Sequence, residues 1–545
     1  MSRRTIAIYI FLASVALFLA GLHNAEFIKI NCRFGLFIHE MNEGFIGPFP
    51  LLYGKPYCDY ISIHTYLMYL ASFLGGVTML TATLPSALAA GGVMSLTYLI
   101  GARMSNKFGL FAVIMLVASY EFLSIARAPS PDMFVAFSTI FAFYLMYTAE
   151  RDKKAMRLFL LPLLFILGFV MRGPIGIVIP VGVVFVYYLL IWRWKTAIAA
   201  GVLGTLVLAS CLMLLIVIIY DEGGRELVKS FQAAQVGSRM TSGKPPWFYF
   251  TNAMLSYSLT YPLCFFVMGT YLCIKRKKYF AKTPNDSYAA LRQALTAWFF
   301  VVVLGMSIPG TKHLRYIVSA LPAAALLAAF IFENPDKLKI FTKVRNIFLS
   351  LCKIAPFVAL GIVIAGAIVL KVLELDIPVP MFLPAVMFLV LGFALIGGAR
   401  KIKDADRIML TITLAAMTFF VIKIMLIEPI ESYVDSSYKM VENIESIRPA
   451  NSKLTFCGIS EDGEALKYLI NLKRKNYYIP NYVSLNENEK ILNLETGTLI
   501  IFKSSKTKFI KPEVKQRLEE VIKGKLGHKK CTVYRLLNVA QPSRL

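Results

Sequence analysis

The residues best suited to chemistry lie in segment 23–81, between the first apolar stretch of the chain and the next. This segment collects charged residues, histidines and other polar side chains in an otherwise apolar part of the chain. They are Glu26, Lys29, Asn31, Arg33, His39, Glu40, Glu43, Lys55, Asp59, Tyr60 and His64. A carboxylate can accept or orient the proton of an attacking hydroxyl, so Asp59 and Glu26 are candidate catalytic groups. Asn31 can orient a hydroxyl but cannot accept its proton.

Four further polar clusters each place a cation beside proline or an aromatic residue. They are Arg127 to Asp132, Arg172-Gly173-Pro174, Arg239 with Lys244 to Tyr249, and Lys312 to Tyr316. Ionisable groups at membrane depth are costly and are therefore candidates for function. Cations bind a phosphate leaving group and stabilise its developing charge, which would complement a carboxylate base. A second interpretation stays open for Arg127, Arg172 and Arg315, which can instead reach lipid headgroups from the ends of spans.

The composition is that of a polytopic α-helical membrane protein. The 545 residues are 57% hydrophobic and 17% charged, with a mean hydropathy of +0.64, whereas soluble domains carry about 25% charge. Repeated apolar runs of about 20 residues predict transmembrane helices. We expect about thirteen spans, at 5–22, 82–101, 109–125, 132–148, 158–171, 174–192, 196–220, 252–273, 293–309, 316–332, 348–371, 380–398 and 408–426. Segment 61–76 is interpreted as an interfacial or re-entrant helix.

The net charge of +26 lies mainly in short loops between spans. With thirteen spans, the basic loops and Arg3-Arg4 fall on one side, which the positive-inside rule makes cytoplasmic. Segment 23–81, loop 221–251 and the C-terminal tail then lie outside. This distribution accounts for the charge without nucleic-acid binding. The N-terminal apolar stretch lacks a small-x-small cleavage site and predicts a retained span.

The composition changes near Glu428, which divides the chain into a transmembrane domain, 1–427, and a small α/β domain, 428–545. Apolar patterning predicts strands at 454–458, 477–483, 498–503 and 531–536, and helices at 462–472 and 512–525. This domain has no catalytic signature. We interpret it as a structural cap over the membrane core.

The eight cysteines show no CxxC or Cys/His spacing for zinc. Disulfides Cys32–Cys58 and Cys457–Cys531 are open if these segments are extracytoplasmic, with free thiols as the alternative. No cofactor is firmly predicted. A divalent metal stays open, because the carboxylates and histidines of segment 23–81 could supply ligands, although no spacing defines a site.

In their order and spacing, these motifs resemble those of the bacterial 4-amino-4-deoxy-L-arabinose transferases and the protein O-mannosyltransferase-like membrane glycosyltransferases of the GT-C fold. The residues that carry the resemblance are Arg33-Phe34, Glu40-Met41, Gly54 to Tyr60, Ala126 to Asp132, Arg172-Gly173-Pro174, Arg239 to Tyr249, and Lys312 to Tyr316. The resemblance covers most of the chain, including the thirteen-span layout and the small outer domain.

The resemblance implies a monomeric, multi-pass glycosyltransferase of the bacterial inner membrane, with its active face and C-terminal domain in the periplasm. The sugar, aminoarabinose-like or other, would pass from a polyprenyl-phosphate donor to a lipid A-like glycolipid of lipopolysaccharide or to another envelope acceptor. Membrane lipids are further expected partners. Nucleic acid is not an expected partner. The implied catalytic residues are Asp59, Glu26 and Asn31, and the implied substrate-binding residues are Arg33, Lys55, Tyr60, Arg127, Asp132, Arg172, Arg239, Lys244, Lys312, Arg315 and Tyr316.

Two positions depart from the family pattern. The first acidic pair of the family falls on Ile30-Asn31, and Glu26, one helical turn earlier, is its candidate substitute. The Pro-Pro step reads Ile61-Ser62, while Asp59 matches the second family acid. We therefore expect either that the donor or acceptor differs or that catalysis depends on Asp59. The alternatives are a catalytically impaired relative that binds polyprenyl phosphate or an envelope partner, and a protein O-glycosyltransferase. A transporter is disfavoured by the odd span count and the lack of an internal repeat.

Overall fold

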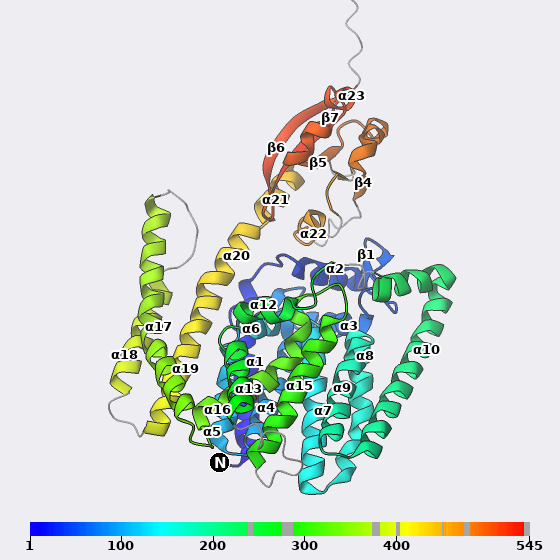
Figure 1. Cartoon of the computed structure of the whole chain (residues 1–545). Helices are drawn as coiled ribbons and strands as arrows, with labels where there is room; N and C mark the ends of the chain where they lie inside the picture. Colours follow the sequence, from blue (N-terminus) through cyan, green and yellow to red (C-terminus); the bar gives the residue numbers. More distant parts are fainter. Residues whose placement is uncertain are drawn as a thin grey trace, which may run out of the picture.

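The computed structural model describes residues 1–545 except 238–242, 275–286, 373–381, 399–403, 450, 451, 453, 461, 462, 473–479 and 539–545. A bundle of long helices carries a small domain with a five-stranded sheet at one end (Figure 1). The N-terminus lies at the opposite end of the bundle (Figure 1). The chain crosses the bundle repeatedly, so alternate connections gather at the same end.

The described helices of the bundle are joined mostly by short connections. They are α1 (Arg3–Leu19), α2 (Asn31–Asn42), α3 (Ser62–Ser72), α4 (Met79–Gly101), α5 (Asn106–Val117), α6 (Tyr120–Ala126), α7 (Asp132–Asp152), α8 (Leu161–Arg172), α9 (Ile175–Leu190), α10 (Trp194–Gln232), α12 (Phe248–Ser256), α13 (Thr260–Ile274), α15 (Ser287–Ser307), α16 (Leu321–Glu333), α17 (Lys339–Val372), α18 (Phe382–Gly398) and α19 (Asp404–Ile422). The 3-10 turns η1 (Leu22–Asn24), η2 (Ala155–Leu160) and η4 (Leu314–Ala320) and the π-turns η3 (Ala233–Gly237) and η5 (Lys423–Ile427) extend them.

The predicted polytopic helical fold is confirmed. Among the described residues, eight helical stretches are long and apolar enough to cross a membrane, or nine when one bent pair counts as a span. Three shorter apolar helices lie at Ile175–Leu190, Thr260–Cys273 and Leu383–Ala394. Each of the thirteen predicted segments contains helix, while the count of thirteen crossings stays a prediction. Helix α3 has 11 residues, too few to cross a bilayer.

The predicted span 109–125 is broken rather than straight. Helices α5 and α6 meet at 77°. A break at membrane depth exposes backbone groups that need partners. The Thr260 hydroxyl donates to the Met115 carbonyl at 2.7 Å, and the Tyr120 N–H donates to the Ser258 hydroxyl at 3.2 Å. Residues from the α12–α13 connection therefore complete the backbone of the bend, which local patterning in 109–125 could not reveal.

The C-terminal domain follows the helices α20 (Glu428–Asp435) and α21 (Tyr438–Ile447). Its sheet has the order β4-β3-β5-β7-β6, with β4, β3 and β5 parallel and β5, β7 and β6 antiparallel. The strands are β3 (Thr455–Cys457), β4 (Asn481–Val483), β5 (Leu499–Lys503), β6 (Leu518–Leu526) and β7 (Lys529–Leu536); a small hairpin, β1 (Leu51–Leu52) and β2 (Lys55–Pro56), lies in segment 23–81. The remaining elements are α22 (Glu464–Leu469), η7 (Leu485–Asn493), η8 (Ser504–Phe509) and α23 (Pro512–Lys515).

The predicted helix at 512–525 is wrong beyond its first turn. Only Pro512–Lys515 is helical, and Leu518–Leu526 is an edge strand paired antiparallel with β7. The Glu- and Lys-rich sequence suits an exposed helix. Pairing with β7 overrides that preference, and Gly527, with φ of +61°, forms the turn that makes the hairpin.

All eight cysteines are free thiols. Cys457 on β3 is opposite Phe502 of β5, whereas Cys531 on β7 is opposite Lys503. Because side chains alternate between the faces of a sheet, the two thiols point to opposite faces. Cys457 accordingly belongs to one buried cluster and Cys531 to another. The open Cys457–Cys531 and Cys32–Cys58 pairs are thus not formed in this structure.

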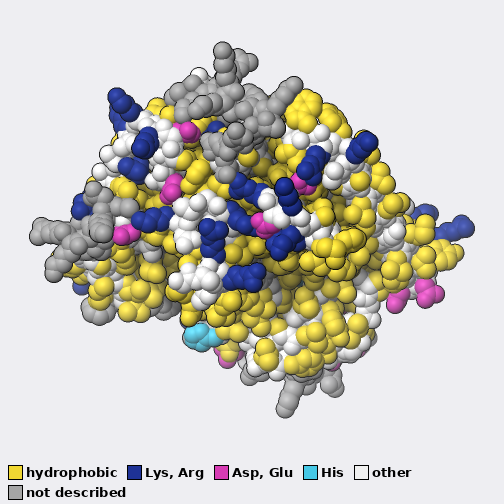
Figure 2. Space-filling view, turned by 90° about the horizontal axis from the view of Figure 1, so that it is seen from below, with side chains coloured by type: hydrophobic (Ala, Val, Ile, Leu, Met, Phe, Trp, Pro, Cys, Tyr) yellow, Lys and Arg dark blue, Asp and Glu magenta, His cyan; other side chains and the backbone are white. Residues whose placement is uncertain are grey.

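The end of the bundle distant from the small domain is basic. Lys and Arg side chains gather near the centre of this face, among few Asp and Glu side chains (Figure 2). Several of these cations are partly neutralised, as in the pairs Arg103–Asp152 and Arg193–Glu150. The candidate site residues lie at the opposite end, under the small domain.

Candidate functional site

Asp132 is the centre of a buried charge cluster. The Arg172 Nε donates to the Asp132 Oδ1 at 2.8 Å, and the Arg315 Nε lies 3.4 Å from Oδ2. The Ser130 hydroxyl donates to Oδ2 at 3.4 Å. Asp132 and Arg172 are 6% and 5% exposed, respectively, whereas the Arg315 side chain is 25% exposed. Two guanidinium groups therefore share one carboxylate, which leaves the cluster one net positive charge.

Three separate elements bring these charges together. Asp132 is the first residue of α7, where the helix dipole favours a carboxylate. Arg172 is the last residue of α8; Gly173, with φ of +73°, then turns the chain, and Pro174 precedes α9. Arg315 lies in η4. The Arg-Gly-Pro motif is thus a tight helix-to-helix turn that places Arg172 beside Asp132.

A ladder of aromatic rings and guanidinium groups connects segment 23–81 to this cluster. The Arg172 Cζ lies 5.0 Å from the Tyr60 ring centroid and 5.8 Å from that of Tyr316. Tyr60 stacks on Tyr57, with ring centroids 5.9 Å apart, and the Arg33 Cζ lies 4.8 Å from the Tyr57 ring centroid. These contacts are cation–π and stacking interactions. They bring Arg33, Tyr60, Arg172 and Tyr316 into one assembly.

Asp59 lies beside this ladder. The Tyr57 hydroxyl donates to the Asp59 Oδ2 at 3.4 Å. The Gln235 Nε2 donates to the carbonyls of Cys58 and Asp59 at 3.0 and 3.2 Å, so η3 fixes the backbone here. The Asp59 side chain is half-buried. Asp59 is thus connected through Tyr57 and Tyr60 to Arg172.

Glu40 holds the shape of the loop. Its carboxylate, 2% exposed, accepts the N–H groups of Tyr53 at 2.6 Å and Gly54 at 3.2 Å. Both residues have positive φ, +58° and +71°, in the β1–β2 turn. Lys55 follows on β2 and is exposed. The Glu-Met motif on α2 therefore holds the turn that opens the Gly-Lys-Pro-Tyr motif.

Lys244 and Lys312 form a cationic strap. The Lys244 Nζ donates to the Lys312 carbonyl at 2.6 Å, and the Lys312 Nζ donates to the Lys244 carbonyl at 3.1 Å and the Pro309 carbonyl at 2.5 Å. Lys312 is 2% exposed. Carbonyl oxygens hydrogen-bond these ammonium groups without neutralising them, so the strap adds positive charge three residues from Arg315.

The two nearby histidines are both disposed to be neutral. Partial loss of water lowers the pKa of His313, and repulsion from Arg315, Lys244 and Arg172 lowers it further. Burial lowers the pKa of His64 to about 3, against the effect of Asp132. The His64 ring packs edge-on against Phe34 and Phe134, and neither ring nitrogen has a hydrogen-bond partner among the described residues. No local sequence pattern indicates this burial.

Other predicted residues lie apart from the cluster. Arg127 forms a two-pronged pair with Glu428, at 2.9 and 2.6 Å, and donates to the carbonyls of Leu17, Phe18 and Ala20. Glu26 lines a cavity of about 210 Å³ beside α22, and Asn31 begins α2. Arg239 lies outside the described residues. Within the described part of the chain, no three His, Cys, Asp or Glu residues are grouped to hold a metal ion.

Comparisons with known proteins agree with this architecture. Residues 62–220 match the family described as dolichyl-phosphate-mannose-protein mannosyltransferase. An uncharacterized protein of Aquifex aeolicus (strain VF5) is 28% identical over 260 residues. The match covers 48% of that protein, so the chain spans about half the length of the curated relative it matches. Two crystal structures of ArnT from Cupriavidus metallidurans, one bound to undecaprenyl phosphate and one apo, superpose with a TM-score of 0.70 at 15% identity, covering 99% of this chain and 99% and 100% of those chains.

The chain therefore has the GT-C fold of multi-pass membrane glycosyltransferases. Over 99% of its length, the chain is similar in structure to ArnT from Cupriavidus metallidurans. The resemblance and the fold class predicted from the motifs are both confirmed.

Proposed function

We propose that this protein is a membrane glycosyltransferase that moves a sugar from a polyprenyl-phosphate donor to an envelope acceptor such as lipid A, at the periplasmic face of the bacterial inner membrane. The observation that carries the proposal is the pair Arg172 and Arg315, held on Asp132 and flanked by the Lys244–Lys312 strap. Such an excess of cations, of which Arg172 and Lys312 are buried, suits a phosphate group. The ArnT structure with undecaprenyl phosphate supports a ligand of this class.

In the proposed reaction, the acceptor hydroxyl attacks the anomeric carbon of the sugar and the bond to the donor phosphate breaks. Asp59 orients that hydroxyl and accepts its proton. Arg172 and Arg315 take up the charge that develops on the leaving phosphate. Tyr60 and Tyr316 keep the two guanidinium groups in place through ring contacts. The basic face at the other end supports the periplasmic orientation of the site.

The test uses purified protein in lipid nanodiscs, a mixture of polyprenyl-phosphate sugars and candidate acceptors, with products followed by mass spectrometry. We expect the wild type to transfer sugar to a lipid A-like glycolipid. We expect Asp59→Asn to reduce the rate of this transfer by about 100-fold or more. Glu43→Gln is the matched control, since Glu43 is exposed at the end of α2. Donor binding without transfer to any glycolipid or protein would instead identify a catalytically impaired relative. Transfer to protein alone would replace lipid A as the acceptor.

A further inference from the structure

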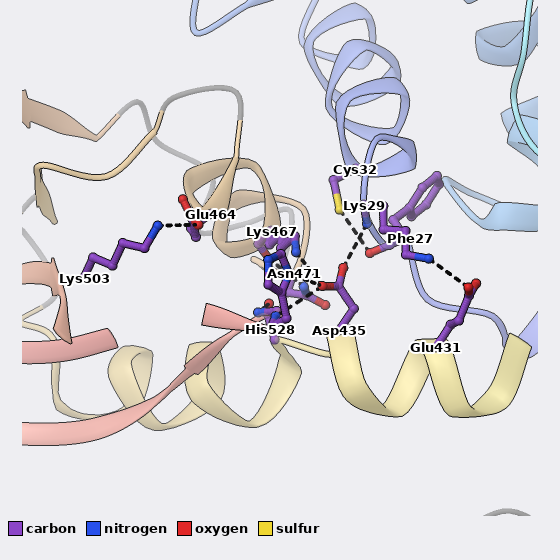
Figure 3. Close-up of polar contacts among 12 residues, drawn as sticks. Phe27, Lys29, Cys32, Glu431, Asp435, Glu464, Lys467, Asn471, Lys503 and His528 are labelled. Carbon is purple, nitrogen blue, oxygen red and sulfur yellow. Dashed lines mark hydrogen bonds and ion pairs between the residues drawn. The ribbon is translucent and has the colours of Figure 1, made fainter. Parts of the chain in front are cut away.

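Asp435, the last residue of α20, joins segment 23–81 to the C-terminal domain (Figure 3). It is 5% exposed. Its Oδ2 accepts the Lys29 N–H at 3.0 Å, and its Oδ1 accepts the Lys467 Nζ at 2.6 Å and the His528 N–H at 3.2 Å. One carboxylate therefore binds the approach to α2, helix α22 and the β6–β7 turn.

The backbone at Lys29 has an unusual conformation. Its φ is +52°, a region that residues with a side chain rarely adopt. Such conformations persist where surrounding contacts hold them, and they are frequent near functional sites. The contact that holds this one is the hydrogen bond to Asp435. The Lys29 side chain also pairs with Glu431 at 2.9 Å, but that pair is exposed and so contributes little.

The contacts of Asp435 with Lys29, Lys467 and His528 are called the Asp435 clamp. The two parts of the chain that it joins also share a hydrophobic core. Phe34, Phe37 and Tyr60 of the membrane part belong to the same buried cluster as Leu466 and Tyr468 of the domain. Contact is tight, since a Cβ on Gly35 of α2 would lie 2.5 Å from the Ile470 Cδ1. Any displacement of the domain therefore shifts α2 and the Tyr60 ring.

We propose that the C-terminal domain positions the reactive segment, with Asp435 as the positioning residue. The inference rests on the proposed transferase function and deepens it. Asp435 fixes the approach to α2, α2 packs with Tyr60, and Tyr60 lies against Arg172. Arg172 and Arg315 themselves stand on α8 and η4, outside the clamp. The clamp therefore acts directly on the segment that carries Asp59 and reaches Arg172 only through the Tyr60 ring, so turnover responds more strongly than binding of the donor phosphate.

The experiment compares Asp435→Asn with wild type in full-length protein reconstituted in nanodiscs. The kcat is expected to fall about tenfold or more, because small misplacements of reacting groups are costly, while the KM for the lipid donor changes less than twofold. Hydrogen exchange of residues 27–34 and 53–60 should accelerate several-fold, with α4 and α7 unchanged. Glu431→Gln, on the same helix, is the matched control and should leave both readouts unchanged.

A second variant perturbs the clamp without removing a charge. In Gly527→Ala the new Cβ would lie 2.1 Å from the Lys467 Nζ and 2.8 Å from the Asp435 Oδ1, so the same pattern is expected if Asp435→Asn does not fold. Unchanged exchange of 27–34 in the folded variants, or faster exchange with unaltered kcat, would overturn the inference. If wild type transfers no sugar, the proposed function fails, whereas the exchange measurement still decides whether the clamp orders the segment.

Discussion

At the residue scale, the candidate site holds more cations than carboxylates. Asp132 neutralises one positive charge of the Arg172 and Arg315 pair, and Lys244 and Lys312 are bonded to carbonyl oxygens. The positive charge that is not neutralised would attract an anionic ligand. Asp59 accepts a hydrogen bond from the hydroxyl of Tyr57, whose ring stacks on that of Tyr60.

Arg172→Lys is expected to lower kcat/KM by about 100-fold. Lysine keeps the charge but loses the planar group that bonds Asp132 and lies over both Tyr60 and Tyr316. Steady-state transfer assays measure the effect. Arg193→Lys, an exposed arginine at the basic end, serves as the control, and equal losses in both variants would contradict the assignment.

His64→Leu is expected to make the protein more tolerant of acid. The His64 pKa of about 3 lies below its ordinary value of about 6.5, so stability is complete above pH 6.5 and is lost as pH falls toward 3. At pH 5 the loss amounts to about 2 kcal/mol. Thermal unfolding in detergent at pH 7.5 and pH 5 should show a smaller decrease for His64→Leu than for wild type. If thermal stability decreased equally in both proteins between pH 7.5 and pH 5, burial of neutral His64 would not be the cause of the acid sensitivity.

At the element scale, irregularities place the site residues. The turn at Gly173 aims Arg172, the β1–β2 turn held by Glu40 presents Asp59, and the α5–α6 bend leads to Arg127 and Asp132. Close packing accompanies them: a Cβ on Gly168 of α8 would lie 2.0 Å from the Gly176 carbonyl oxygen of α9. Small residues permit such helix contacts in membranes.

Thr260→Val is expected to destabilise the protein by about 1 kcal/mol, because the Met115 carbonyl at the bend loses its donor. Thr205→Val is the control: its hydroxyl bonds the Gly201 carbonyl within the same helix, on an exposed surface. Thermal unfolding in detergent compares the two. If Thr205→Val lost more thermal stability than Thr260→Val, the hydrogen bond at the bend would not account for the effect.

At the scale of the whole molecule, the C-terminal domain and the bundle are one packed unit. They share a hydrophobic cluster, and the chain that connects them is anchored where Glu428 meets Arg127. The substrate-binding role predicted for Arg127 stays a prediction, and its contacts favour an anchoring role. The domain boundary near 427 and 428 therefore marks a change in composition across a continuous run of helix.

Arg127→Gln discriminates between the two roles. Removing one partner of a fully buried pair costs about 3–5 kcal/mol, and this is the upper limit here because the Glu428 side chain is 25% exposed. Anchoring therefore predicts a clear decrease in thermal stability. The donor KM of the protein that remains folded should change less than twofold. Arg225→Gln, an exposed arginine on α10, should alter neither. A higher KM for the donor with unchanged thermal stability would instead support the substrate-binding role of Arg127.

The sequence by itself determined the membrane class, the helical segments and the motif set, because apolar runs and charged loops are local properties. It also identified Arg172, Arg315, Asp132, Tyr60 and Tyr316, which the fold brings together. Only the tertiary structure decided that Leu518–Leu526 is a strand, that Arg127 meets Glu428, and that Asp435 holds Lys29. The β6–β7 partners are up to 18 residues apart, and the other two contacts join residues 301 and 406 apart. No local pattern encodes such pairings.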